Sequence, residues 1–400
     1  MKLSHRHTVA SCFIGYVVQA IVNIFVPLLF VTFQSQYEIP LSEITVLIAV
    51  NFAVQLTVDF SSAFFIDKIG YRAAGLMAHG FAAAGLILLT FLPDLFTNAF
   101  WGLLISVIVY AFGGGLLEVI VSPIVEACPT KNKAQIMGIL HSFYCWGSVA
   151  VVGLSTLFFS LCGIENWKIM TYIWAAVPVC NLVYFIFVPL APLSAEGGGA
   201  GLKAIFKNKY LWLFLLIMLC AGACELAISQ WASLFAEKGL GVSKTVGDLT
   251  GPAVFALLMG ISRLIYGKLS KRIGIEHLML FGGLLCVAAY LMIALVPDPV
   301  AGLVGVGLCG FSVGALWPGA FSAAVNTVKG GTSLFAFLAL AGDTGCILGP
   351  AVAGAFGDDL HTGILVAVVF PALLVAALIP LIVAERRKKK IDLRSESGRD

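Results

Sequence analysis

Charged side chains are scarce in this chain. Lys, Arg, Asp and Glu together make up 11% of its 400 residues, whereas soluble domains carry roughly a quarter. Hydrophobic residues make up 60% of the chain, and its mean hydropathy is +1.01. A water-soluble fold of this length could not cover so much apolar surface. The composition therefore excludes a soluble protein and indicates one surrounded by lipid, and the net charge of +3 is too small to indicate a nucleic-acid partner.

Catalytic signatures are also missing. The sequence contains no phosphate-binding loop, metal-ligand cluster or nucleophile triad, and no stretch has the composition of a soluble domain. We therefore predict a protein that is not an enzyme, holds no metal and uses no cofactor besides a coupling ion, a proton or sodium. A non-transporting membrane receptor, or an intramembrane enzyme, is the alternative from another class. A soluble sensing domain would favour the receptor, and a catalytic constellation within the spans would favour the enzyme.

Cysteine usage does not indicate a disulfide framework. The ten cysteines lie mostly inside apolar stretches, where a free cysteine behaves as a small buried residue. Cys220 and Cys224 are one helical turn apart and adjoin Glu225, which leaves a soft-metal site as a minor alternative.

Long apolar runs separated by short polar breaks are the main feature that is present. A helix of roughly 20 apolar residues crosses a hydrocarbon core of about 30 Å. The predicted spans lie near 8–33, 43–66, 73–93, 98–127, 134–162, 168–190, 210–236, 246–267, 277–296, 300–325, 332–356 and 362–384. The sequence therefore predicts an all-α integral membrane protein with twelve transmembrane helices.

A glycine-rich break at 193–201 divides the twelve spans into six and six. We predict an N-terminal six-helix bundle over 1–192 and a C-terminal one over 208–385. A linker at 193–207 joins them, and a basic tail follows at 386–400. The second span ends in Asp67-Lys68-Ile69-Gly70, and the eighth ends in a similar Lys271-Arg272-Ile273-Gly274, which indicates pseudo-symmetric halves.

The orientation follows from the distribution of Lys and Arg. If the N-terminus is cytoplasmic, the outer loops hold only Lys168, Lys238 and Lys244. The inner segments hold all other basic residues except Arg263, which lies within a span. The first apolar run is too long for a cleaved signal peptide. We therefore predict a multi-pass protein of the plasma membrane, a bacterial inner membrane, with both termini cytoplasmic. The expected partners are a small-molecule substrate and the lipid bilayer, and the expected state is a monomer.

Two parallel six-helix repeats resemble the major facilitator superfamily, in which the substrate lies between the halves near the midplane. Ala63-x-x-x-Asp67-Lys68-x-Gly70-x-Arg72 is similar to the signature loop of that family between helices 2 and 3, with alanine where glycine is usual. The resemblance implies that charges here latch the cytoplasmic ends of the two halves. A generic basic turn is the alternative. The predicted gate residues are Asp67, Arg72, Glu126 and Arg263.

A narrower resemblance is to the fucose permease family of sugar–proton symporters. Its motifs are similar to Glu118–Pro123 in the fourth span, His141–Gly147 in the fifth and Trp317–Ser322 in the tenth. The acidic residue that these permeases carry in helix 1 is missing, and the polar residues in that region are Gln19 and Asn23. The resemblance implies proton-coupled uptake of a monosaccharide or a similar small polyhydroxylated solute.

Ionisable residues inside the spans are the candidates for coupling, because a charge at mid-bilayer costs several kcal/mol and marks a pathway or a buried pair. Glu118 is the leading candidate, since Glu118, Ser122 and Glu126 recur every fourth residue and make one face of the helix polar. The glycines at 113–115 allow close helix approach or ligand access. The predicted proton-coupling residues are Glu118, Glu225, His141, Asp59 and Asp343.

The substrate site is predicted from the helices that line the cavity in the resembled fold. Glu118 and Glu225 would face that cavity from opposite halves, and tryptophans deep in the spans offer flat faces for a sugar ring or serve in packing. The predicted substrate-binding residues are Asn23, Gln19, Glu118, His141, Tyr144, Trp146, Glu225, Gln230, Trp231 and Trp317.

Several interpretations remain open. Asn51, Gln55, Asp59 and Ser62 form a polar stripe on the second span that could line the cavity, bind sodium or join the eleventh span. Arg263 is either a partner for an acid or a gate. A sodium-coupled or exporting transporter of the same fold is the main alternative to proton-coupled uptake.

Overall fold

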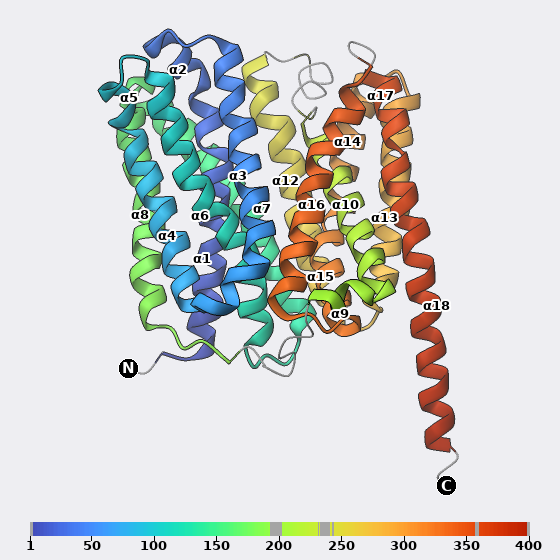
Figure 1. The fold of residues 1–400 in the computed structure, drawn as a ribbon. Coiled ribbons are helices and arrows are strands. Elements are labelled where there is room, and N and C mark those ends of the chain that lie inside the picture. Colours follow the sequence, from blue (N-terminus) through green and yellow to red (C-terminus); the bar gives the residue numbers. More distant parts are fainter. Residues whose placement is uncertain are drawn as a thin grey trace. The chain divides into compact units, whose positions relative to one another are not determined.

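The computed structural model describes residues 3–192, 202–230, 232, 241, 244–356 and 360–397, and the regular secondary structure of these residues is entirely helical (Figure 1). Trp231 and the glycine-rich break at 193–201 lie outside the described residues. The predicted tail 386–400 continues the last helix as far as Ser397.

The first unit of the fold begins with the N-terminal helices. Their bounds are α1 His5–Ile24, η1 Val26–Leu29, α2 Phe30–Tyr37, α3 Leu41–Ile69, α4 Tyr71–Leu89, α5 Leu92–Leu95, α6 Ala99–Ala127, α7 Lys133–Cys162, η2 Ile164–Asn166 and α8 Trp167–Phe187. The later helices are α9 Leu202–Lys207, α10 Lys209–Ser229, α12 Lys244–Leu269, α13 Ile275–Leu295, α14 Pro299–Val313, α15 Leu316–Thr327, α16 Gly331–Gly354, α17 Leu360–Ala367 and α18 Val369–Ser397.

Twelve helical segments of the described chain are long and apolar enough to cross a membrane, which confirms the predicted number of spans. The tenth span differs in detail, because it consists of α14 and α15 with a break at Gly314 and Ala315. Pro318 explains the break, since it has no N–H to donate to the carbonyl of Gly314. The first span likewise ends in the short helix η1, which contains Pro27.

The chain divides into two compact units. One contains residues 1–205 together with 329–343, and the other contains 206–328 together with 344–400. The first part of α16 therefore belongs to the N-terminal unit. The bundle boundaries at 192 and 208 remain predictions.

Helix α6 is the centre of the first unit and packs against α1, α3 and α4. Two of its glycines make this contact possible. A Cβ at Gly113 would lie 2.5 Å from both the carbonyl oxygen of Ala78 and the amide nitrogen of Ala82 on α4, and a Cβ at Gly115 would lie 3.0 Å from the Cα of Gln55 on α3. The glycines at 113–115 therefore provide close helix approach, one of the two roles predicted for them.

A buried polar network joins α1, α4 and α8 in the same unit. The Ser11 hydroxyl donates to Asn181 Oδ1 at 2.9 Å, and Asn181 Nδ2 lies 2.6 Å from His79 Nε2. The other ring nitrogen of His79 bonds to the carbonyl oxygen of Gly75 at 2.7 Å. Since all of these polar groups have partners, this network fixes helix positions.

In the second unit, α10 packs against α14, α15 and α18. The predicted packing motif Gly345-x-x-x-Gly349 on α16 lies against α10. A Cβ at Gly345 would clash with the carbonyl oxygen of Leu219, and a Cβ at Gly349 would clash with that of Ala223. Such contacts are typical of membrane helices, in which small residues let backbones approach closely.

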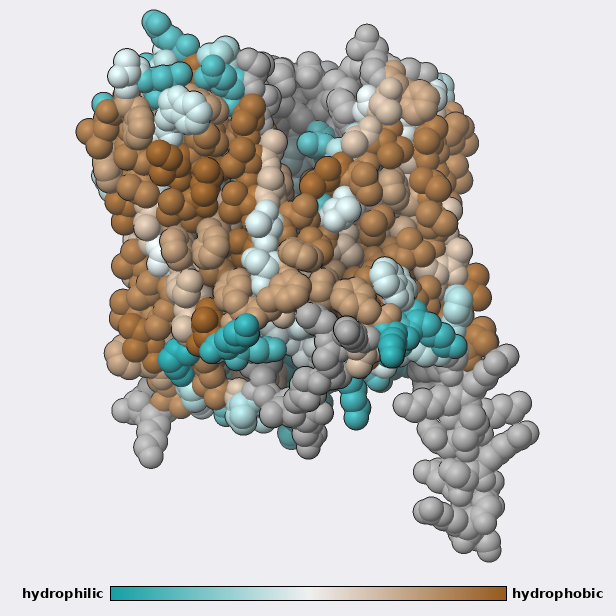
Figure 2. Space-filling view, viewed as in Figure 1, coloured by the Kyte–Doolittle hydropathy of each residue, from teal (hydrophilic) through white to brown (hydrophobic). Residues whose placement is uncertain are grey.

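The surface of each unit is apolar along its flanks. In Figure 2, hydrophobic side chains cover the flank of each unit that faces the viewer, and hydrophilic ones gather toward the ends. Large side chains such as Leu157, Leu161 and Phe281 are 54%, 76% and 62% exposed. Lipid tails rather than water suit such a surface.

Candidate functional site

Glu118 is half-buried, whereas every other residue from Gly113 to Val125 on α6 is buried. The amide of Gln19 on α1 donates from Nε2 to Glu118 Oε2 at 2.6 Å, and Gln19 is itself buried. The structure therefore brings together two residues that were predicted for the site, one from each of two packed helices.

One turn beyond Glu118, Ser122 joins Tyr16 to His141. The Tyr16 hydroxyl is hydrogen-bonded to Ser122 Oγ at 3.2 Å, and Ser122 Oγ lies 3.4 Å from His141 Nε2. The rings of Tyr16 and His141 lie 5.0 Å apart between centroids. Tyr16 was not predicted, although Tyr16, Gln19 and Asn23 follow the i, i+3, i+7 spacing of one helix face.

Three amides converge at Asn23, one turn further along α1. Asn23 Oδ1 accepts from Gln55 Nε2 at 2.8 Å and from Asn51 Nδ2 at 3.2 Å. Two residues of the polar stripe on α3 therefore bind α3 to α1. They are hydrogen-bonding groups next to a predicted substrate residue.

Asp59 continues the stripe and is fully buried. Neither of its carboxyl oxygens has a hydrogen-bond donor among the described residues, and the same is true of Ser62 Oγ. The carboxyl groups of Asp343 and Glu118 both act on it electrostatically. Three of the predicted coupling acids thus form one cluster in the first unit.

In the second unit, Glu225 on α10 and Arg263 on α12 form an ion pair. Arg263 Nη2 lies 3.5 Å from Glu225 Oε2, and the two side chains are 3% and 13% exposed. This is the arrangement expected if Arg263 is the partner of an acid. Its role as a gate stays a prediction.

The other predicted substrate residues are spread more widely. Trp317 is buried on α15 with its ring 6.2 Å from that of Phe321, and Gln230 is exposed at the C-terminal end of α10. Tyr144 and Trp146 are half-buried on α7. Trp231 lies outside the described residues.

Three of the predicted gate residues, Asp67, Arg72 and Glu126, lie near the ends of helices in the first unit. Asp67 Oδ1 accepts a hydrogen bond from the Thr332 hydroxyl, and the Thr332 oxygen is also hydrogen-bonded to the Tyr71 hydroxyl. Glu126 is half-buried, and its backbone carbonyl accepts from Lys133 Nζ.

Arg72 binds the last carbonyls of α8. Its guanidinium donates to Phe185 O at 2.8 Å, to Ile186 O at 2.7 Å and to Val188 O at 2.7 Å. A cation at a helix C-terminus is favourable because the carbonyls there have no partner within the helix. In this structure the signature-loop arginine therefore stabilises the first unit itself.

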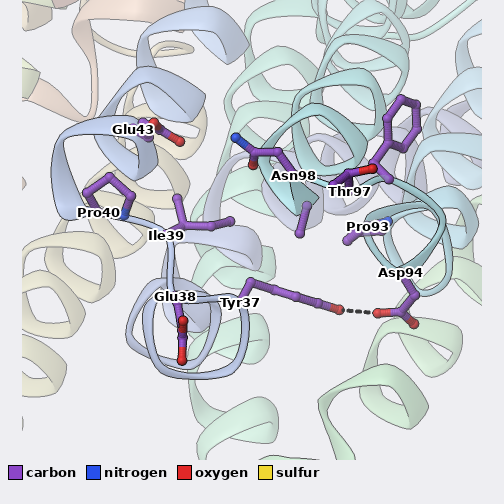
Figure 3. A pocket seen from close by; sticks show the side chains of 11 residues that line it. Tyr37, Glu38, Ile39, Pro40, Glu43, Pro93, Asp94, Thr97 and Asn98 are labelled. Carbon is purple, nitrogen blue, oxygen red and sulfur yellow. Dashed lines mark hydrogen bonds between the residues drawn. The ribbon is translucent and has the colours of Figure 1, made fainter.

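A pocket of about 480 Å³ lies at one end of the first unit, where the α2–α3 and α5–α6 connections meet (Figure 3). Tyr37 points across it and donates to Asp94 Oδ1 at 2.9 Å, and Lys168 Nζ lies 2.6 Å from Asp94 Oδ2. Partial burial raises the pKa of Asp94, but the bonds from Lys168 and Tyr37 outweigh it and hold that pKa below its usual value. No local pattern in the sequence indicates this pocket, because turns far apart in the chain form it.

No group of three or more His, Cys, Asp or Glu side chains in the described part of the chain could hold a metal ion. Cys220, Cys224 and Glu225 are described residues, so the minor alternative of a soft-metal site finds no support.

Twelve apolar helices, with acids inside their spans, define a multi-pass membrane protein. The sequence profile of the major facilitator superfamily matches residues 10–350, so the chain belongs to that family. Its members are transporters and not enzymes, as predicted. A comparison with curated proteins found no match.

Solved structures with the same fold include sugar symporters. The transporter FucP in its outward conformation has a TM-score of 0.76 at 16% identity, with 92% of this chain and 97% of that chain covered. The proton:xylose symporter XylE has a TM-score of 0.74 at 11% identity, covering 92% and 94%. The human organic anion transporter MFSD10 has a TM-score of 0.73 at 16% identity, covering 93% and 99%. At these identities the likeness establishes the fold alone.

Proposed function

We propose that the protein is a secondary active transporter that takes up a monosaccharide or a similar polyhydroxylated solute together with protons, by alternating access. The proposal rests on the burial and hydrogen bonding of Glu118. It is a carboxyl group inside a membrane span, it is the one half-buried residue of an otherwise buried stretch of α6, and it is bonded to a neutral amide. Such a group can take up and release a proton within the membrane.

Gln19 suits both protonation states of Glu118. Its Nε2 donates to the carboxyl group, while its buried Oε1 has no hydrogen-bond partner in the described part of the chain. Because an amide carries a donor at one end and an acceptor at the other, rotation by half a turn presents Oε1 to a protonated carboxyl. Gln19 is one of the two polar residues in the region where the fucose permeases resembled by this sequence carry an acid, and an amide can stabilise either form of Glu118 without a charge of its own.

The substrate class is supported by the chemistry around this carboxyl. Asn23, Asn51 and Gln55 offer amide donors and acceptors, which match sugar hydroxyls. Two solved structures with this fold, an E. coli fucose:proton symporter and a proton:xylose symporter, are of sugar transporters. Sodium coupling and export are the alternatives that the experiments must separate.

We further propose that both termini face the cytoplasm and that the protein lies in a bacterial inner membrane. The support is the excess of Lys and Arg in the segments that would then be internal.

Substrate binding provides the first experiment. Purified protein is screened for thermal stabilisation by monosaccharides, in sodium chloride and in choline chloride. Any sugar that stabilises it is then offered to proteoliposomes with an imposed inward proton gradient. Stabilisation independent of sodium, and accumulation that collapses with a protonophore, are the expected results. Accumulation driven by a sodium gradient alone would contradict proton coupling.

Variants test the site itself. Glu225→Ala, Gln230→Ala and Trp317→Ala should each weaken equilibrium binding of that sugar by about 1–3 kcal/mol, because each removes a side chain that is predicted to contact it. Trp101→Ala is the matched control, since Trp101 is 53% exposed on the flank of α6. Unchanged affinity in all three variants would show that the sugar binds elsewhere.

A further inference from the structure

Asp59 is held in an environment that does not suit an isolated carboxylate. It is 0% exposed, and no donor among the described residues reaches either of its oxygens. Gln55, one turn earlier on α3, donates to Asn23. A buried charge without hydrogen bonds is strongly unfavourable, so Asp59 needs a stabilising partner.

The groups that face Asp59 are themselves acids. Asp343, in the part of α16 that belongs to the first unit, brings its carboxyl within hydrogen-bonding reach, and Glu118 on α6 acts on Asp59 through its charge. Helix α1, which also packs against α6, contributes the uncharged Gln19 and Asn23 to this region. The local field therefore opposes two negative charges at 59 and 343.

A single proton resolves both difficulties. Two ionised carboxylates only accept hydrogen bonds and repel one another. If one is protonated, its O–H donates to the other, and the pair carries one negative charge instead of two. The contact between Asp59 and Asp343 then becomes a hydrogen bond.

We infer that Asp59 and Asp343 hold one proton between them and form a proton site separate from Glu118. The inference deepens the proposed coupling function, because it assigns a second proton to the same cluster. It depends on contacts within the first unit and on no property of the sugar.

The site also controls how residues 329–343 dock on α3. Near its start this segment is fixed by Thr332, which donates to Asp67, and by the Ser333 hydroxyl, which donates to Ala63 O at 3.2 Å. At its end it is fixed by the contact of Asp343 with Asp59. Loss of the shared proton leaves two like charges at that end, so docking weakens as the pH rises.

Proton counting tests the site directly. The parent protein carries Glu118→Gln, which removes the titration of Glu118. Purified protein is titrated in choline chloride from mildly acidic to alkaline pH, with circular dichroism to confirm that it stays folded. The parent should release one more proton above neutral pH than the same protein with Asp59→Asn or with Asp343→Asn. Asparagine keeps the shape and supplies an N–H to the remaining carboxylate.

Two results would overturn the inference. One is equal proton release by the parent and both Asn variants. The other is release of the extra proton on addition of sodium chloride but not choline chloride, which would make the pair a sodium site. Because no substrate is involved, failure here is distinguishable from failure of sugar transport.

Hydrogen–deuterium exchange gives an independent readout of docking. After correction for the intrinsic effect of pH, exchange in peptides covering 329–343 should rise with pH in the parent and stay low in the Asp59→Asn variant. Exchange that does not depend on pH in the parent would contradict the link between the proton and docking.

Discussion

The contact between α6 and α4 positions Glu118, and Gly113→Ala tests it. The new Cβ would lie 2.5 Å from Ala78 O and 2.5 Å from Ala82 N, which are backbone atoms that no side-chain rotation can move aside. The two helices would have to separate, and overpacking of this kind costs about 1–3 kcal/mol. Alanine also gains up to about 1 kcal/mol over glycine in a helix, which partly hides the loss.

Gly153→Ala is the matched control, because Gly153 lies in the long helix α7 and its Cβ would meet no atom within 4 Å. Both variants gain the same helix propensity, so the difference between them is the overpacking cost of about 1–3 kcal/mol. The assay is loss of the monodisperse peak in size-exclusion chromatography after heating in detergent. If Gly113→Ala is as stable as Gly153→Ala, the close packing of α6 on α4 is wrong.

Three further predictions concern charged side chains. Arg72→Met should lower the stability of the fold by about 1–3 kcal/mol, because three charge-assisted hydrogen bonds to the end of α8 are lost. Lys68→Met, at an exposed position, is the control and should change the result of the same heating assay little. The pKa of Asp94 is lower in the folded protein than its ordinary value of about 3.9. Its interactions with Lys168 and Tyr37 therefore stabilise the fold at any pH above that ordinary value, and this stabilisation is lost as the pH falls through the pKa of the folded protein. Asp94→Asn should therefore flatten the acid limb of the stability–pH curve. Glu225→Ala removes the acid that faces the buried guanidinium of Arg263 and should lower the stability of the fold by about 3 kcal/mol. Adding Arg263→Met to the same chain should restore part of that stability. Equal stability of the single and the double variant would contradict the pairing.

The spans could be predicted from the sequence because the signal is local. A run of about twenty apolar residues has few alternatives to a membrane helix, and the structure has all twelve. The break in the tenth span was also readable in principle, since Pro318 cannot continue the hydrogen bonding of the preceding turn. The prediction of one continuous helix over 300–325 followed the apolar run and did not take account of Pro318.

The partners of polar side chains were much harder to predict. Glu118 stood out because a charge in a span is rare, but nothing local to it indicates that Gln19, 99 positions earlier, donates to it. The signature loop suggested a latch, and the structure shows Arg72 binding carbonyls more than a hundred residues away. Such pairings depend on which helices pack together, and in this chain glycines such as Gly115 determine that packing.

We propose that Glu118 carries the coupled proton. The decisive measurement compares Glu118→Gln with wild type in proteoliposomes, using the sugar found by the thermal-shift screen. The amide keeps the shape and the hydrogen bonding of the carboxyl but cannot titrate. We expect that the variant no longer accumulates sugar under a proton gradient, while exchange of labelled for unlabelled sugar continues. If Glu118→Gln still concentrates the sugar against its gradient, the proton is carried elsewhere and the account is wrong.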